Sequence, residues 1–189
     1  MKHKIIAGKN VYFFTSVKST MDTAKKLRAK IKEPVVVSII QKQGRGRQGN
    51  RWISNEGGLW ISIVWECVSK KALNYLFFIG AKAIVDTLRD IGIKNPGIKL
   101  PNDVFVNGRK IAGVLIENLD SHVIIGIGIN VNNAITEEMG TAISCKEILG
   151  YNIAHESILY LLLNNIQGLR HQCEKQNLDF LKNITGLLI

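Results

Sequence analysis

The stretch DVFVNGRKIAGVLIE, residues 103–117, decides what kind of sheet this sequence can form. Asn107 and Gly108 separate two extended runs, and both residue types tolerate the positive φ angles of a two-residue type I′ turn. The two runs are therefore predicted to pair as an antiparallel hairpin. A hairpin at this point indicates a sheet that is not purely parallel.

Further strands and helices are predicted on both sides of this hairpin. Short runs rich in β-branched and aromatic residues predict strands at residues 11–17, 34–41, 59–66 and 122–132. Helical spacing of apolar residues, or a capping residue followed by an acid, predicts helices at residues 19–31, 72–91 and 154–176. This order favours an α+β fold in which a mixed, largely antiparallel sheet carries helices on one side.

Length and composition favour one domain over residues 1–189, since 46% hydrophobic residues can supply a core. Cys67, Cys145 and Cys173 are widely spaced, and the four histidines have no metal-ligating spacing, so neither a disulfide framework nor a metal site is indicated. No apolar run reaches the ~18 residues of a membrane span. The apolar run after the basic start is too short for a secretory signal. We therefore expect a cytoplasmic protein with no membrane partner.

Positive charge is concentrated in one part of the chain. Nine of the Lys and Arg residues fall within residues 25–52, where Glu33 is the only acid, and the whole chain carries a formal charge of +10. Such a distribution favours anionic partners, whether a nucleotide, a nucleic acid or an acidic protein.

The loop at residues 44–49, GRGRQG, matches the G-x-G-x-x-G pattern of dinucleotide-binding turns. That pattern must open a helix, whereas residues 51–58 contain SNEGG and lead into a predicted strand, which disfavours a dinucleotide site. The loop instead carries the planar cations of Arg45, Arg47 and Arg51, which suit phosphate or carboxylate, and Trp52 adds a flat surface. The alternative is a basic surface loop that binds RNA or nothing.

Two other segments carry candidate site residues. In residues 98–113, Lys99, Asn102, Asp103 and Lys110 gather around the predicted hairpin, and Gly113 permits close approach of a ligand. The alternative is a simple turn followed by a solvated lysine. In GIGIN, residues 126–130, the alternate glycines indicate either a ligand or a crossing helix, and Asn130 ends the strand.

Taken together and in order, these segments resemble the biotin protein ligases. The loop GRGRQGNRW, residues 44–52, is similar to the family pattern G-R-G-R-x-G-R-x-W. KLPND, residues 99–103, and GRKIAG, residues 108–113, resemble K-W-P-N-D followed by G-x-K-x-A-G. An upstream S-T-M and the later GIGIN complete a resemblance that spans residues 14–132.

The resemblance implies a fold like that of class II aminoacyl-tRNA synthetases and biotin synthetases. It implies a ligase that uses ATP and Mg²⁺ to form biotinyl-5′-AMP and then transfers biotin to a lysine of a biotin carboxyl carrier protein. The chain is expected to be a catalytic domain without the N-terminal DNA-binding or C-terminal SH3-like domain of some members, and so without a DNA partner. A homodimer is left open.

Residue roles follow from the same resemblance. Lys110 and Arg45 would bridge the biotin carboxylate and the α-phosphate, Arg47 would hold phosphates, and Lys99 would assist the departing pyrophosphate. Asp103 would orient either Lys110 or a Mg²⁺-bound water. Biotin would also contact Ser19, Thr20, Gln41, Gly44 and Gly113, and the nucleotide would contact Trp52, Asn102 and Asn130.

Two positions depart from the family pattern. Leu100 replaces a tryptophan and is expected to alter packing behind the site, and Asn50 stands where a basic residue is common. A lipoate protein ligase is the nearest alternative, although its arginine-glycine pattern followed by histidine is missing here. A basic nucleic-acid-binding module rests on charge alone.

Overall fold

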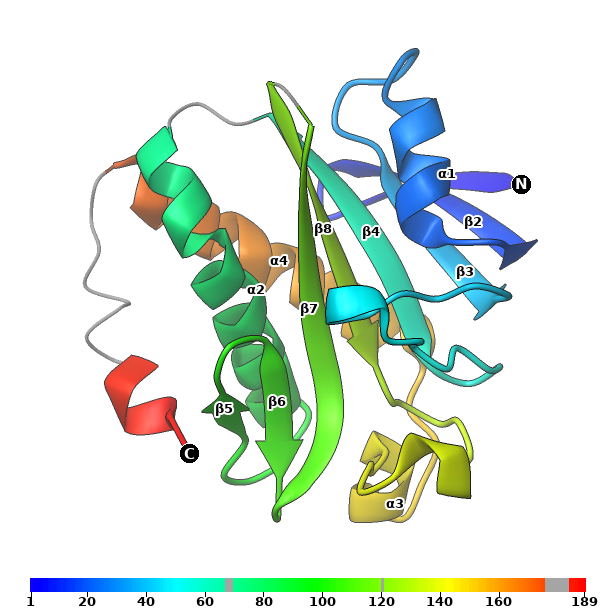
Figure 1. The fold of residues 1–189 in the computed structure, drawn as a ribbon, viewed down its shortest axis with the longest axis vertical. Coiled ribbons are helices and arrows are strands. Elements are labelled where there is room, and N and C mark those ends of the chain that lie inside the picture. The colour runs from blue at the N-terminus through cyan, green and yellow to red at the C-terminus, as the bar shows by residue number, and fades with distance from the viewer. Residues whose placement is uncertain (67–69, 120, 176–183) are drawn as a thin grey trace.

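The computed structural model describes residues 1–66, 70–119, 121–175 and 184–189, with the side chains of residues 70–74 left aside. Cys67 and the predicted end of the last helix at Gln176 lie outside the described residues. The helices and longer strands, shown in Figure 1, are β1 (Lys2–Ile6), β2 (Lys9–Val17), α1 (Thr20–Leu27), β3 (Val35–Gln41), β4 (Leu59–Glu66), α2 (Lys70–Asp90), β5 (Gly97–Lys99), β6 (Asp103–Val106), β7 (Arg109–Leu119), β8 (His122–Ile129), α3 (Cys145–Leu149) and α4 (His155–Glu174).

The eight strands form one sheet in the order β1-β2-β3-β4-β8-β7-β6-β5. Strands β2 and β3 pair in parallel, and the other neighbours in this order pair antiparallel. Asn107 and Gly108 have φ angles of 52° and 71° and join β6 to β7, as the turn chemistry requires. The predicted α+β class and the predicted hairpin are both confirmed.

Strand β1 was not predicted from the sequence. Strand β1 pairs antiparallel with β2 at the edge of the sheet, and its residues are exposed except for Ile6. An edge strand exposed in this way carries a polar sequence, here KHKII, so it lacks the apolar signal of an inner strand. Ala7 and Gly8, both with positive φ, form the turn into β2.

The helices cover both faces of the sheet, so their predicted placement on one side is wrong in this detail. Helices α2 and α4 pack together on one face, whereas α1 packs against β3, β4 and β8 on the other (Figure 1). Successive side chains of a strand point to opposite faces. Val35 and Val37 therefore join the α2–α4 core, and Val36 joins the smaller core under α1.

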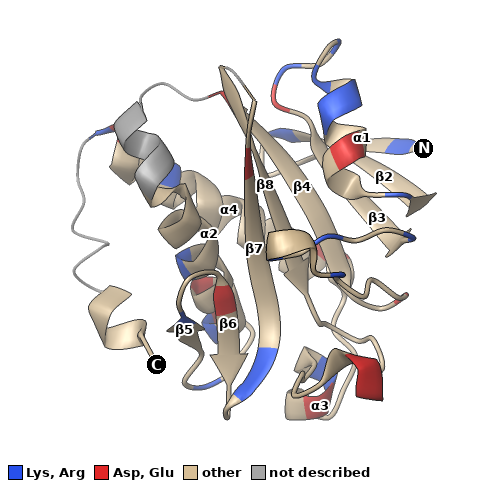
Figure 2. Ribbon diagram, viewed as in Figure 1, with Lys and Arg blue, Asp and Glu red and all other residues tan. Residues whose placement is uncertain are grey.

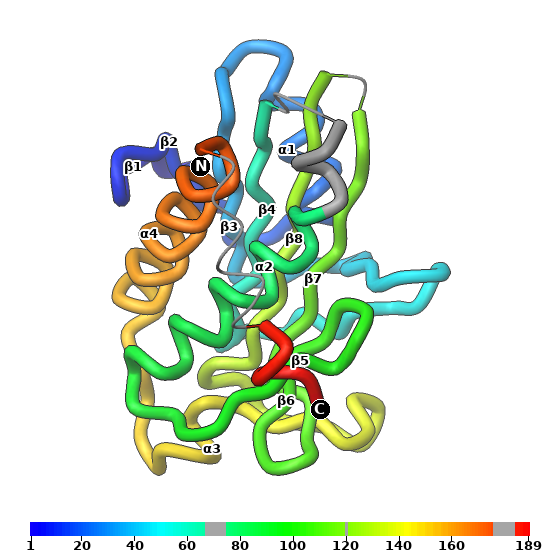
Figure 3. Tube along the Cα trace, turned by 90° about the vertical axis from the view of Figure 1, so that its left-hand side faces the viewer, coloured from blue at the N-terminus to red at the C-terminus, as the bar shows by residue number. Residues whose placement is uncertain are grey.

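Cations gather on one part of the molecule. Figure 2 shows Lys and Arg on α1, on the turn that follows it and along the loop between β3 and β4. This loop stands out from the sheet on the side opposite α4 (Figure 3). It therefore overhangs the face that α1 covers only in part. In the described part of the chain, no helix is long and apolar enough to cross a membrane.

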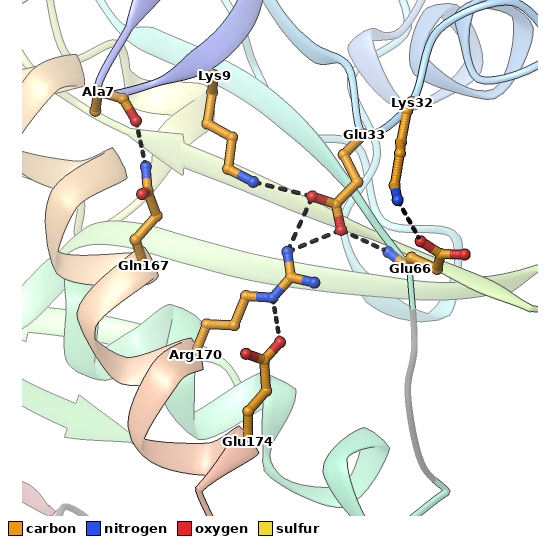
Figure 4. Close-up of polar contacts among 8 residues, drawn as sticks. All are labelled: Ala7, Lys9, Lys32, Glu33, Glu66, Gln167, Arg170 and Glu174. Atoms are coloured by element: carbon orange, nitrogen blue, oxygen red, sulfur yellow. Dashed lines mark hydrogen bonds and ion pairs between the residues drawn. The ribbon is translucent and has the colours of Figure 1, made fainter.

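A cluster of charged side chains ties α4 to the sheet (Figure 4). The Glu33 carboxylate accepts hydrogen bonds from Lys9 Nζ at 2.9 Å, from Arg170 at 2.8 and 3.0 Å, and from the backbone N–H of Glu66 at 3.1 Å. The Arg170 guanidinium also lies over the Trp65 ring, 4.8 Å from its centroid. Burial alone would raise the pKa of Glu33, but these hydrogen bonds outweigh burial and hold the pKa below its usual 4.5.

Candidate active site

A cavity of about 170 Å³ lies between α1, the β3–β4 loop and the face formed by β7 and β8. It brings together side chains that are far apart in the sequence. The predicted site residues that line it are Ser19, Thr20, Gln41, Arg45, Arg47, Trp52, Asn102, Asp103, Lys110 and Gly113. Most of the predicted site thus converges on one hollow.

One end of the cavity holds a connected set of hydroxyl and amide groups. Gln41 Oε1 accepts hydrogen bonds from the backbone N–H of Thr20 at 2.8 Å and from its hydroxyl at 2.9 Å. The Gln41 amide nitrogen donates to Ser54 Oγ at 2.9 Å, and the Ser62 hydroxyl donates to Thr20 Oγ1 at 2.8 Å. These bonds fix which way the Gln41 amide faces. The cavity wall therefore offers a preset pattern of donors and acceptors.

The glycine- and arginine-rich loop forms a tight turn and no α-helix. The backbone N–H of Gly46 donates to the Asn50 carbonyl at 2.7 Å, that of Trp52 donates to the Gly44 carbonyl at 2.9 Å, and Arg45 and Arg51 form a β-bridge. Between them lies a single 3₁₀ turn, Arg47–Gly49. A dinucleotide turn that opens a helix is therefore excluded here.

Gly44 does not line the cavity, but it holds the base of the loop. A Cβ at this position would lie 2.3 Å from the Trp52 carbonyl oxygen and 2.5 Å from Ser54 Oγ. Any larger residue would separate the two arms of the loop.

Trp52 lies on a floor made by two glycines. Gly113 of β7 and Gly128 of β8 are cross-strand partners. A Cβ on Gly128 would lie 2.4 Å from Trp52 Nε1, and a Cβ on Gly113 would lie 3.1 Å from Trp52 Cζ3. A Cβ on Gly126 would meet the Met21 sulfur of α1 at 2.9 Å, so this glycine accommodates a crossing helix, which is one of the two reasons considered. The indole is therefore placed by the absence of side chains beneath it.

Lys110 lies at the centre of the polar groups. Its ammonium is 2.7 Å from Asp103 Oδ1 and 5.0 Å from the centroid of the Trp52 ring. The carboxylate and the ring face restrain a flexible side chain, because both attract a cation. The ion pair between Asp103 and Lys110 agrees with one of the two roles considered for Asp103, which stays a prediction.

Arg45 lines the cavity, but its guanidinium is paired with two carboxylates. It bonds to both oxygens of Asp22, at 2.8 and 2.9 Å, and to Glu117 Oε1 at 3.1 Å. The Arg45 bond lowers the pKa of Asp22, and the Asp22 bond raises that of Arg45 further. Burial raises the pKa of Glu117, but hydrogen bonds from Lys25 and Arg45 lower it overall. All three groups are therefore charged at neutral pH.

A second cavity of about 150 Å³ adjoins the first. Arg51, Trp52 and Lys110 line both cavities, so these three side chains separate the two. Asn130 lies in the second cavity and is buried, with its Oδ1 accepting a hydrogen bond from Asn133 at 3.1 Å. The other residues that line it are Ile53, Glu138, Met139 and Ala142.

Lys99 and Leu100 of the K-L-P-N-D segment lie apart from both cavities. Lys99 Nζ sits over the Phe105 ring, 5.1 Å from its centroid, and lines neither cavity. The expectation that the replacement of tryptophan by Leu100 alters packing behind the site stays a prediction. The leucine itself is 52% exposed. The reason is that this side chain lies in a surface turn.

Several residues of the site were missed in the sequence. Ser54 and Ser62 complete the hydrogen-bond network around Gln41, and Asp22 and Glu117 hold Arg45. Single serines and surface acids have no local pattern that marks them. Their partners lie on other elements, so only the fold brings them together.

Metal ligands are sparse. In the described part of the chain no group of three His, Cys, Asp or Glu side chains could hold a metal ion. Asp103 is the one carboxylate among the residues that line the first cavity, and Glu138 lines the second. Cys145 is buried elsewhere, and burial raises the pKa of its thiol to about 12. It is therefore protonated and unsuited to metal binding or nucleophilic attack.

The sequence model of the biotin/lipoate A/B protein ligase family matches residues 13–130 of this chain. The chain is 31% identical to the bifunctional ligase/repressor BirA of Bacillus subtilis over 172 residues, which are 84% of this chain and 53% of that protein. It is 31% identical to a biotin acetyl-CoA-carboxylase ligase of Mycobacterium tuberculosis over 109 residues, which are 54% of this chain and 41% of that protein. The chain thus spans about half the length of these curated relatives.

The fold is also that of a solved enzyme. Superposition on the biotin protein ligase from Aquifex aeolicus in complex with biotin and ATP gives a TM-score of 0.88 with 31% sequence identity. The match covers 96% of this chain and 79% of the other. The residues matched by the family model include α1, the β3–β4 loop and strands β6 to β8, which are the elements that build the first cavity.

Proposed function

We propose that this chain, which belongs to the biotin/lipoate A/B protein ligase family, activates biotin with ATP and transfers the biotinyl group to a lysine of a carrier domain. The observation that carries this proposal is the meeting of two cavities at Lys110, one ending in an amide and hydroxyl network and the other at Asn130. We assign the whole chain, residues 1–189, to one catalytic domain.

The first cavity suits the bicyclic head of biotin. A buried ureido group needs partners for its carbonyl and both N–H groups, because each one left unpaired costs about 1–3 kcal/mol. Thr20 Oγ1 keeps an acceptor site after bonding to Gln41 and Ser62, and Ser19 adds a second hydroxyl. The apolar side chains that surround the rest of the cavity are Met21, Ile61, Val114, Leu115 and Ile127.

The second cavity suits the adenine of ATP. Trp52 offers a broad aromatic face at its boundary, and Asn130 offers an amide. Each cavity is smaller than the ~300 Å³ at which drug-sized sites begin. An acyl adenylate must therefore occupy both cavities at once, with its phosphate near Lys110 and Arg51, which line both.

The first half-reaction joins two anions. The biotin carboxylate attacks the α-phosphorus of ATP, an acyl–phosphate bond forms, and pyrophosphate leaves. Cations that neutralise both reactants and hold them in line lower this barrier. Lys110, Arg45 and Arg47 line the cavity and are assigned this role. Mg²⁺ bound to ATP would neutralise phosphate charge, and Asp103 in the first cavity or Glu138 in the second is the carboxylate that would hold it.

In the second half-reaction the carrier lysine arrives at the same point. Its amine bonds to the acyl carbon, and AMP leaves. The loop at residues 44–52 overhangs the cavity, and its closure would keep water from the adenylate. We propose a biotin carboxyl carrier domain as the partner, as the name of the Mycobacterium tuberculosis relative suggests. Widely spaced cysteines support the cytoplasm as the compartment.

Calorimetric titration of the purified protein with biotin and with lipoate tests this assignment. Wild-type protein is expected to bind biotin and to bind lipoate far more weakly. Gln41→Ala should weaken biotin binding by roughly 5- to 150-fold, the equivalent of 1–3 kcal/mol for one unpaired polar group. Gln43→Ala changes an exposed glutamine two positions away and serves as the matched control. Preference for lipoate, or binding of neither acid, would contradict the proposal.

A further inference from the structure

The guanidinium of Arg45 spans two walls of the first cavity by pairing with carboxylates outside it. Asp22 is in the first turn of α1, and Glu117 is near the end of β7. Asp22 takes both arms of the guanidinium fork, at 2.8 and 2.9 Å, and Glu117 takes a third bond at 3.1 Å. Neither acid lines the cavity. The loop is therefore joined to α1 and to β7 through one side chain.

These ion pairs form a closed set of charges. Lys25, one turn beyond Asp22 on α1, places its ammonium 2.6 Å from Glu117 Oε2. The two cations and two carboxylates then neutralise one another. The Arg45 and Asp22 side chains are 36% and 44% exposed, so water and salt limit the strength of each pair.

Holding Arg45 also holds the rest of the loop. The bridge between Arg45 and Arg51 and the bond from Trp52 N–H to the Gly44 carbonyl make residues 44–52 a small hairpin. A hairpin of this kind moves as a unit, because its arms are bonded across. The carboxylates on α1 and β7 thus fix Trp52 together with Arg45.

The same guanidinium is needed by the proposed reaction. An arginine has five N–H donors in a rigid fork, and both terminal nitrogens of Arg45 already face carboxylates. A substrate carboxylate or phosphate can accept two parallel hydrogen bonds from the fork only when it replaces Asp22 or Glu117, because each pair of donors already includes one that is bonded to an acid. The carboxylates of Asp22 and Glu117 and the anionic groups of the substrates therefore need the same N–H donors of Arg45.

We propose that Asp22 and Glu117 are positioning residues that hold Arg45 and its loop, and that they compete with biotin and ATP for the guanidinium. Ligand binding then exchanges one set of anions for another at Arg45. The competition rests on the proposed function, whereas the holding of the loop does not.

Two measurements separate these parts. Limited trypsin digestion of ligand-free protein reports on the loop, because Arg47 and Arg51 are exposed cleavage sites within it. Asp22→Asn and Glu117→Gln should each speed cleavage in the loop about two- to fivefold, as expected for the loss of exposed ion pairs. Glu156→Gln breaks another exposed pair, with Lys4, and changes the net charge equally, so it should leave cleavage unchanged.

Calorimetry reports on the competition. Asp22→Asn should bind biotin and ATP about two- to fivefold more tightly, since Arg45 no longer has to leave a charged partner. The KM of biotin-dependent pyrophosphate exchange should fall without a matching fall in kcat. In an Arg45→Ala background, Asp22→Asn should change neither cleavage nor binding.

Unchanged cleavage in both acid variants would overturn the holding role. Faster cleavage with weaker or unaltered ligand binding would overturn the competition. Weaker binding would mean that the acids only order the loop for the ligands, and unaltered binding would mean that they do not affect ligand affinity. If wild-type protein binds neither biotin nor ATP, the proposed function fails and with it the competition. The digestion result then judges the holding role alone.

Discussion

Gly128→Ala should displace Trp52 from its place at the boundary between the two cavities. The added Cβ would lie 2.4 Å from Trp52 Nε1, 2.6 Å from Cε2 and 2.8 Å from Cζ2, whereas ordinary contact begins at 3.4 Å. The indole must therefore move by about 1 Å, because Gly128 is held in mid-sheet between β4 and β7. Overpacking of this size costs about 1–3 kcal/mol.

That cost should appear as lost ATP affinity. If the displaced ring must return to its original place for adenine to bind, the variant should bind ATP roughly 5- to 150-fold more weakly. Biotin affinity should change less, because the Gln41 network lies at the other end of the first cavity. Calorimetric titration with ATP and with biotin measures both effects.

Two glycine variants provide graded controls. Gly113→Ala brings a Cβ to 3.1 Å from the same indole, so its effect should be smaller. Gly126→Ala, on the same strand as Gly128, meets the flexible Met21 thioether and should leave ATP binding near the wild-type value. Wild-type ATP affinity in folded Gly128→Ala protein would refute the idea that the glycine floor places Trp52.

Three further outcomes are expected. Glu33→Gln should lower the free energy of unfolding by about 1–3 kcal/mol at neutral pH. Because the native pKa of Glu33 is depressed, the difference between wild type and variant should shrink as the pH falls below 4.5. Urea titrations at several pH values measure this difference, and a difference that stays constant would contradict the stabilising role of the Glu33 carboxylate. Gly168→Ala, at an exposed site in α4 where the added Cβ meets nothing within 4 Å, should raise the free energy of unfolding by about 0.5–1 kcal/mol. The midpoint of thermal unfolding should rise with it, and a lower midpoint would contradict a helical conformation at this position. Ser62→Ala should weaken biotin binding severalfold while sparing ATP binding, since the serine reaches the site only through Thr20; equal loss for both ligands, measured by calorimetry, would refute this.

The hairpin and the central strands follow from local sequence. Asn-Gly between extended runs has one favoured geometry, and the structure adopts it. The run PVVVSIIQ, residues 34–41, is apolar at successive positions, which is typical of a strand covered on both faces. That signal agrees with helices on both sides, so the prediction of one covered face overlooked it.

The candidate site was predictable in its members but not in its connections. Ten of the predicted residues line one cavity. Most of them were identified by the chemistry of two short segments, and the resemblance added Ser19, Thr20 and Gln41. The ion pairs of Arg45 join residues 23 and 72 positions apart, and no motif marks Asp22 or Glu117. Lys99 belongs to a motif, yet its ammonium lies over the Phe105 ring and it lines neither cavity. Local sequence identifies which chemical groups are available for a site, whereas only the tertiary structure determines which of these groups are in contact.

The central claim is adenylation of biotin at Lys110. Exchange of labelled pyrophosphate into ATP, measured with Mg²⁺ and with biotin, lipoate or neither acid, tests it most directly. The account predicts exchange that requires biotin and falls by roughly 10²–10³-fold in Lys110→Ala, as for the loss of one charge-stabilising group. Exchange supported only by lipoate, exchange unaffected by Lys110→Ala, or no exchange by folded wild-type protein would contradict it.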